Sequence, residues 1–220
     1  VKNNRNAIDL VTDAGDIESC DWGYDYSKGM NMMMPGLSQC RRVAYLTVAD
    51  ARILAEKGDY RTALNRCLSV RKMARHMVDK LLITYLVGIS VNDLANNCIR
   101  DILSGMPQDV ESLVWLERQL LKIESKFPPV KYSILGDFEV MAIDLRKEKA
   151  KEMLQMMSDG GSTTITDVVK NRLSDGDDEF FARNKDYINN YYVEAVAALD
   201  MPYAQAYDKL VKLSEKVKKD

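Results

Sequence analysis

The stretch ILAEKGDYRTALNRCL, residues 53–68, decides the fold. Apolar residues recur at three- and four-residue steps on both sides of Gly58 and Asp59, which predicts one helix over 37–57 and another over 60–77. Glycine tolerates the left-handed conformation that often follows a helix end, and aspartate is a good N-cap because its carboxylate accepts a hydrogen bond from a free backbone N–H. The two helices are therefore expected to fold back on each other as an antiparallel hairpin.

The rest of the chain is also predicted to be helical. It contains 12 Met and only five Pro, and no segment alternates apolar and polar residues with the period of a strand. We expect an all-α fold of stacked antiparallel helix hairpins, with about eight helices among the segments 3–18, 37–57, 60–77, 80–103, 108–125, 132–158, 164–173, 179–199 and 203–218.

The strongest linker signal is DGGST at 159–163. It divides the chain into a main helical domain over 1–158 and C-terminal helices over 159–220. These C-terminal helices are expected to pack on the main domain and to belong to the same folding unit.

The composition excludes some classes of partner. Hydrophobic residues make up 46% and charged residues 29% of the 220, the balance of a chain that packs a core without metal or disulfide. The formal net charge of -2 gives no broad positive field, so nucleic acid is not expected as a partner. The longest apolar run, 81–91, is about half of the ~20 residues that cross a bilayer, so this segment is expected to have no membrane span. Whether a membrane anchor precedes Val1 is left open.

The hairpin sequence resembles the turn of a tetratricopeptide repeat. The positions that fit this pattern are Ala51, Leu54, Gly58, Tyr60 and Ala63. Thr47 and Asp50 do not supply the large apolar residues of its first helix, and Arg75 replaces its closing proline. Such arrays repeat about every 34 residues, and no second copy starts at that distance from Gly58. We expect one repeat-like hairpin rather than an array; the alternative is an ordinary helix pair with the same capping chemistry.

A wider resemblance covers most of the chain. The order of features is similar to that of a family of uncharacterised bacterial all-helical proteins, often exported or anchored by an N-terminal hydrophobic segment. The matching stretches are the aromatic loop 22–36, RRVAYLTVADARILAEKGDYRTAL, LLITYLVGI, GDFEVMAIDLRKE and NKDYINNYYVEA followed by MPYAQAYDKL. This resemblance implies an exported or cell-envelope location, with a cytoplasmic one as the alternative, and it supplies no catalytic residue.

The four cysteines show no metal-binding spacing. At ~1.5 Å per helical residue, a turn at 58–59 puts Cys40 and Cys67 roughly 15 Å out of register, too far for a disulfide. A similar count separates Cys67 from Cys98. Cys20 and Cys40 could pair because an adaptable loop joins them, and an exported protein would favour this disulfide. The alternative is four small buried thiols.

Neither metal, cofactor nor catalytic residue is expected. His76, the only histidine, has no nucleophile at a telling spacing, so a structural or exposed role is predicted. NDLAN at 92–96 and DDEFF at 177–181 resemble parts of the metal–diphosphate motifs of helical terpene synthases, but their order is reversed and Arg100 stands at an acidic position. Three acids share a face of the helix predicted at 132–158, and no Glu-x-x-His accompanies them: Asp137, Asp144 and Glu148.

The aromatic loop is the candidate binding site. Trp22, Tyr24 and Tyr26 lie in a stretch broken by glycine, and functional aromatic residues often lie on loops. The alternative is that the three rings cap the helical core.

The predicted function is a non-enzymatic helical interaction or scaffold module that binds a protein or peptide between hairpins. The alternative is an enzyme or small-molecule binder with an acid-lined pocket between helices. An enclosed pocket holding several carboxylates would favour the alternative, whereas an open face with exposed Trp22 or Tyr24 would favour the interaction module.

Overall fold

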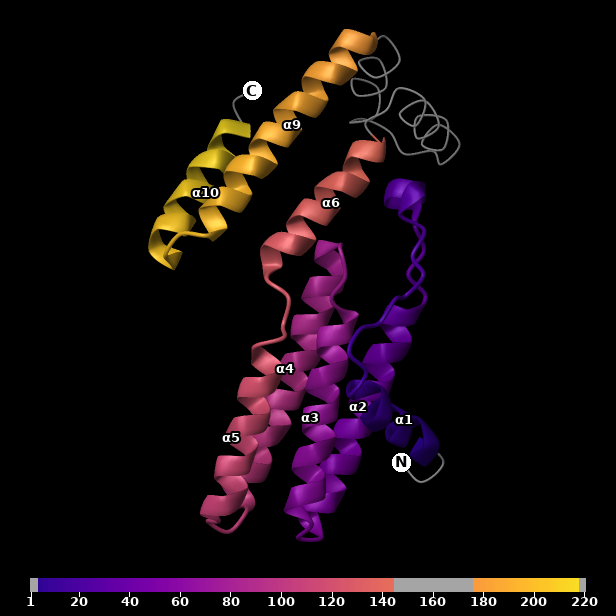
Figure 1. Ribbon diagram of the computed structural model, residues 1–220, viewed down its shortest axis with the longest axis vertical. Coiled ribbons are helices and arrows are strands. Elements are labelled where there is room, and N and C mark those ends of the chain that lie inside the picture. Colours follow the sequence, from indigo (N-terminus) through magenta and orange to yellow (C-terminus); the bar gives the residue numbers. More distant parts are fainter. Residues whose placement is uncertain (1–3, 145–175, 218–220) are drawn as a thin grey trace, which may run out of the picture. The chain divides into compact units, whose positions relative to one another are not determined.

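The computed structural model describes residues 4–144 and 176–217, and within these ranges it is all-α (Figure 1). The predicted fold class is therefore confirmed. The helices are α1 (Arg5–Gly15), α2 (Gly36–Glu56), α3 (Tyr60–Met77), α4 (Leu82–Gly105), α5 (Val110–Glu124), α6 (Val130–Asp144), α9 (Asp178–Leu199) and α10 (Tyr203–Val217), with a 3-10 helix, η2 (Tyr26–Asn31), between α1 and α2. The helix predicted at 164–173, the linker at 159–163 and the domain boundary at 158 lie outside the described residues.

The chain divides into two compact units. The first consists of Val1–Tyr24 and Met33–Ser133, and the second of Asp25–Met32 and Ile134–Asp220. The first unit contains α1 to α5 and the main hydrophobic core.

Helix α3 is the central element of the first unit and contacts α1, α2, α4 and α5. Small residues on its neighbours, among them Ala44 and Ala51 of α2 and Ala95 of α4, are fully buried and allow the helices to approach closely. Because α3 is covered on several sides, its buried residues do not form one stripe: Ala63, Leu64, Cys67, Leu68, Ser69, Val70, Arg71, Ala74 and Met77.

The turn between α2 and α3 is made by Gly58 and Asp59. Gly58 has a φ of 81°, in the left-handed region that favours glycine. Its N–H donates to the carbonyl of Ala55 at 2.9 Å, and the carboxylate of Asp59 accepts from the N–H of Thr62 at 3.2 Å. The helix before the turn is thereby closed and the helix after it capped.

Replacing Gly58 with alanine is expected to lower the free energy of unfolding by about 1 kcal/mol, because the left-handed conformation is unfavourable for a residue with a Cβ. Urea titration measures this loss. Gly105→Ala is the matched control, since an added Cβ there also meets no atom within 4 Å and φ is not positive. Equal stability of the two variants would contradict the role given to the turn.

Cys67 of α3 and Cys98 of α4 are fully buried free thiols, and no disulfide joins them. They nevertheless lie close enough to shift each other's pKa, so the predicted separation by register was wrong. The neighbouring Cys98 thiol and burial raise the pKa of Cys67, and the Cys98 thiol lies 3.9 Å from the carbonyl of Val48. The predicted helices over 60–77 and 80–103 leave only two residues between them. Val78 and Leu81 are instead extended, with ψ of 116° and 140°, so α4 begins beyond the end of α3 and the register shifts.

The second unit contains a helix pair, α9 and α10. Asp177 caps α9 by accepting a hydrogen bond from the N–H of Phe180 at 2.8 Å. Ala198 of α9 and Leu213 of α10 are buried. The Phe138 ring of α6 lies 5.0 Å from the Tyr192 ring of α9, measured between centroids.

No helix among the described residues is long and apolar enough to cross a membrane.

Candidate functional site: an apolar pocket beside α1

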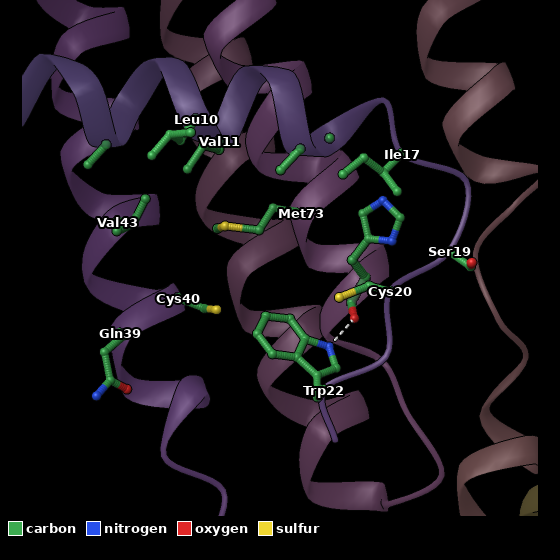
Figure 2. Close-up of a pocket in the computed structure, with 14 residues that line it drawn as sticks. Leu10, Val11, Ile17, Ser19, Cys20, Trp22, Gln39, Cys40, Val43 and Met73 are labelled. Carbon is green, nitrogen blue, oxygen red and sulfur yellow. Dashed lines mark hydrogen bonds between the residues drawn. The ribbon is translucent and has the colours of Figure 1, made fainter. Parts of the chain in front are cut away.

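The first unit contains a pocket of about 380 Å³ between α1, α2 and α3 (Figure 2). Figure 2 shows Met73 of α3 between Val43 of α2 and Ile17, which follows α1. The lining of this pocket consists almost entirely of carbon and sulfur atoms. The residues that contribute them are Ala7, Leu10, Val11, Ala14, Gly15, Ile17, Ser19, Cys20, Trp22, Gln39, Cys40, Val43, Met73 and His76.

Helix α1 forms one wall because it carries two adjacent apolar stripes. Ile8 and Val11, at 0% and 8% exposure, face the core. A second stripe at three- and four-residue steps, Ala7, Leu10, Ala14 and Ile17, lines the pocket. Leu10 and Ile17 are 65% and 56% exposed, so the pocket has an open, apolar rim.

A polar clamp, consisting of Arg5, Asp9, Thr12, Asp50 and Arg66, fixes α1 against α2 and α3. The guanidinium of Arg66 lies 2.7 Å from the carboxylate of Asp9 and donates to the hydroxyl of Thr12 at 2.7 Å. Arg5 donates to Asp50 at 3.0 Å. The Nε of Arg66 lies 3.3 Å from the Asp50 carboxylate without hydrogen-bond geometry, so that contact is electrostatic.

Residues 16–21, called the strap below, connect α1 to the aromatic loop. The Nζ of Lys72 lies 2.5 Å from the Asp16 carboxylate, and Arg75 donates to the carbonyl of Ile17 at 3.1 Å. Two cationic side chains of α3 therefore hold the strap, one at the Asp16 carboxylate and the other at the Ile17 carbonyl.

Trp22 closes another side of the pocket. Its indole Nε1 donates to the carbonyl of His76 at 2.7 Å, the dashed line in Figure 2. The start of α2 comes close to the ring: a Cβ at Gly36 would lie 3.3 Å from it. The Tyr24 ring is stacked on Trp22 with a centroid distance of 6.5 Å. Trp22 is therefore anchored to α3 and only half-buried.

The predicted aromatic site is divided by the fold. Trp22 and Tyr24 lie together in the first unit, whereas Tyr26 begins η2 in the second unit. All three side chains are half-buried.

Cys20 and Cys40, the predicted disulfide pair, both line the pocket and are free thiols in the structure. Burial raises the pKa of both thiols. Cys20 lies close enough to Cys40 to raise the pKa of Cys40 further. Because the thiolate is the reactive form, neither group is an activated nucleophile. Whether the two cysteines form a disulfide on oxidation stays a prediction.

His76 is held as a neutral imidazole. Its pKa is lowered by burial and by the positive charge of Arg75, and the nearby backbone of Gly15 and Ile17 partly opposes this shift. Arg75 lies 2.9 Å from the ring Nε2, which makes this nitrogen the acceptor. With Nε2 engaged by Arg75, this nitrogen does not serve as a base for the thiols.

The lowered pKa of His76 predicts a loss of stability on acidification. The unfolded chain binds the proton near the ordinary pKa of 6.5, whereas the folded chain binds it only at lower pH, so the free energy of unfolding falls as pH drops below 6.5. Urea titrations at pH 7.5 and 5.5 should show a larger loss for the wild type than for His76→Gln. Equal losses would contradict this assignment.

Leu10, Val43 and Met73 were not predicted from the sequence as pocket residues. A signal was present in the second apolar stripe of α1, which extends the apolar face of this helix beyond the part that faces the core.

Within residues 4–144 and 176–217, no three His, Cys, Asp or Glu side chains gather as metal ligands. Asp137 lies in α6, whereas the side chain of Asp144 and all of Glu148 lie outside what the structure describes.

Comparison of the chain with family models, curated proteins and solved structures gives no match. The resemblance to a bacterial helical family and to a tetratricopeptide hairpin therefore stays a prediction.

Proposed function

We propose that this chain is a non-enzymatic helical binding module, and that the apolar pocket receives apolar side chains from a segment of a partner protein or peptide. The observation that carries the proposal is the pocket itself: it has an apolar lining and an open rim on which Leu10 and Ile17 are exposed. Partner side chains that fill such a pocket provide much of the free energy of an interface.

The chemistry of the lining favours binding over catalysis. No Asp or Glu lines the pocket, so it does not support the acid-lined pocket of the alternative function. The thiols of Cys20 and Cys40 have raised pKa values, and the acceptor nitrogen of His76 faces Arg75. The pocket therefore presents no group prepared for acid–base or nucleophilic chemistry.

The pocket sets the expected strength of binding. A fully buried Leu or Phe side chain contributes roughly 1.5–3 kcal/mol, whereas a micromolar complex requires about 8 kcal/mol. Several anchors of one segment must therefore act together. A short helix with apolar residues at three- and four-residue steps would present them on one face.

Selection from a phage-displayed library of random 12-residue peptides, with the full chain as bait, tests the proposal. Enriched peptides should share two or three apolar residues at helical spacing. Ala14→Phe, which fills the pocket from α1, should weaken the binding of a selected peptide at least about tenfold, the loss of one anchor. Ala182→Phe, at an exposed alanine of α9, is the matched control.

Two results would overturn the proposal. One is a library from which no apolar peptide is enriched. The other is a set of peptides that Ala14→Phe binds as tightly as the wild type and the Ala182→Phe control do.

A further inference from the structure

A second hollow, called the basic groove below, shares strap and α1 residues with the apolar pocket. It measures about 540 Å³ and lies between the end of α1, α3 and α5. Gly15 and Ile17 line both hollows, so the two sites adjoin each other. Four cationic side chains line the basic groove, Lys72, Arg75, Lys122 and Lys126, together with two acidic ones, Asp16 and Glu18.

The positive charge of the basic groove is only partly neutralised. Lys72 is paired with Asp16 at 2.5 Å, and Arg75 is engaged with the carbonyl of Ile17. Lys122 and Lys126 have no ion pair to any residue in the described part of the chain. Both are exposed, so their charges are available to a partner.

Helical periodicity directs these two charges toward the groove. Gln119 and Lys122 are three residues apart on α5, and Lys126 follows four residues later, just past the helix end. They therefore lie on one side, adjacent to the buried Ile123. Lys72 and Arg75 of α3 also line the groove.

From this juxtaposition we infer that the partner segment carries acidic side chains next to its apolar anchors: the anchors fill the apolar pocket, and Asp or Glu residues bind in the basic groove. The inference rests on the proposed function and specifies the chemistry of the partner. Complementary charge at the rim of an interface raises the rate of encounter and fixes the register of the bound segment.

The test repeats the peptide selection with Lys122→Glu/Lys126→Glu. Wild-type peptides should contain Asp or Glu on one side of the apolar anchors, and the double variant should enrich Lys or Arg at those positions. A wild-type-selected peptide should bind the double variant about tenfold more weakly at low salt, and the difference should shrink in 0.5 M NaCl because the charges are exposed.

Lys57→Glu/Lys185→Glu is the matched control. It changes the net charge by the same amount at two exposed lysines, one after α2 and one on α9, that line neither hollow. It should bind the wild-type-selected peptide as tightly as the wild type does.

The outcomes separate the two proposals. One outcome would overturn the role of the basic groove alone. In it, Ala14→Phe weakens the binding of selected peptides, but these peptides show no acidic preference and bind both double variants equally well. A library that yields no apolar peptide would overturn the proposed function and this inference together.

Discussion

Replacing Asp50 with alanine is expected to lower the free energy of unfolding by about 3 kcal/mol. Asp50 is 2% exposed, and its carboxylate lies 3.0 Å from Arg5 and 3.3 Å from Arg66. Its removal leaves the guanidinium of Arg66, whose side chain is only 12% exposed, with Asp9 as its remaining anionic partner. A largely buried charge that loses its most buried partner is costly because less of its desolvation is offset.

Asp101→Ala is the matched control for this prediction. Asp101 forms an ion pair with Arg52 at 2.9 Å, but the two side chains are 61% and 53% exposed. Exposed pairs contribute about 0–1 kcal/mol, so this variant should be close to wild type in a urea titration. Similar losses in the two variants would show that the polar clamp on α1 does not stabilise the fold in the way described.

Gly88→Leu is expected to lower the free energy of unfolding by about 3 kcal/mol or to prevent folding. A Cβ at this position would lie 2.9 Å from the Val78 side chain and 3.0 Å from the backbone carbonyl of Ala74. The larger side chain must therefore move α4 away from α3, and overpacking of this kind commonly costs about 1–3 kcal/mol, occasionally more. Gly88→Ala should show a smaller loss, because the same contact opposes the higher helix propensity of alanine.

The matched control is Gly105→Leu at the end of α4, where an added Cβ meets nothing within 4 Å. Surface changes of this kind usually stay within about 0.5 kcal/mol. Thermal unfolding followed by circular dichroism compares the variants. If Gly88→Leu unfolds at the same temperature as the control, the close approach of α3 and α4 is contradicted.

The helices could be predicted because their ends are set by local chemistry. Gly58 and Asp59 define the α2–α3 turn through backbone conformation and capping, which depend on the residues within one helical turn. The register of α3 against α4 could not be obtained in this way, because it depends on the connection 78–81, which is extended at Val78 and Leu81, and on the packing of Gly88.

The candidate site was predicted only in part. Trp22 was predicted as a binding residue, and Cys20 and Cys40 as a possible disulfide pair; all three line the pocket, but the other lining residues come from elements distant in the chain. In the sequence, Met73 and Val43 are indistinguishable from ordinary helix residues. They line a pocket only because the polar clamp fixes α1 beside them. The basic groove has the same origin: Lys72 and Lys122 lie 50 residues apart and meet only through tertiary packing.

The most direct test of binding at the apolar pocket is a ¹H–¹⁵N spectrum of the full chain, recorded with and without a selected peptide. The chain has two tryptophans, and Trp115→Phe assigns their indole signals. The indole N–H of Trp22, which bonds the carbonyl of His76 at the pocket, should shift on binding, while that of Trp115 on α5 should not. A peptide that binds without moving the Trp22 signal, or that moves only the Trp115 signal, would contradict the proposed function.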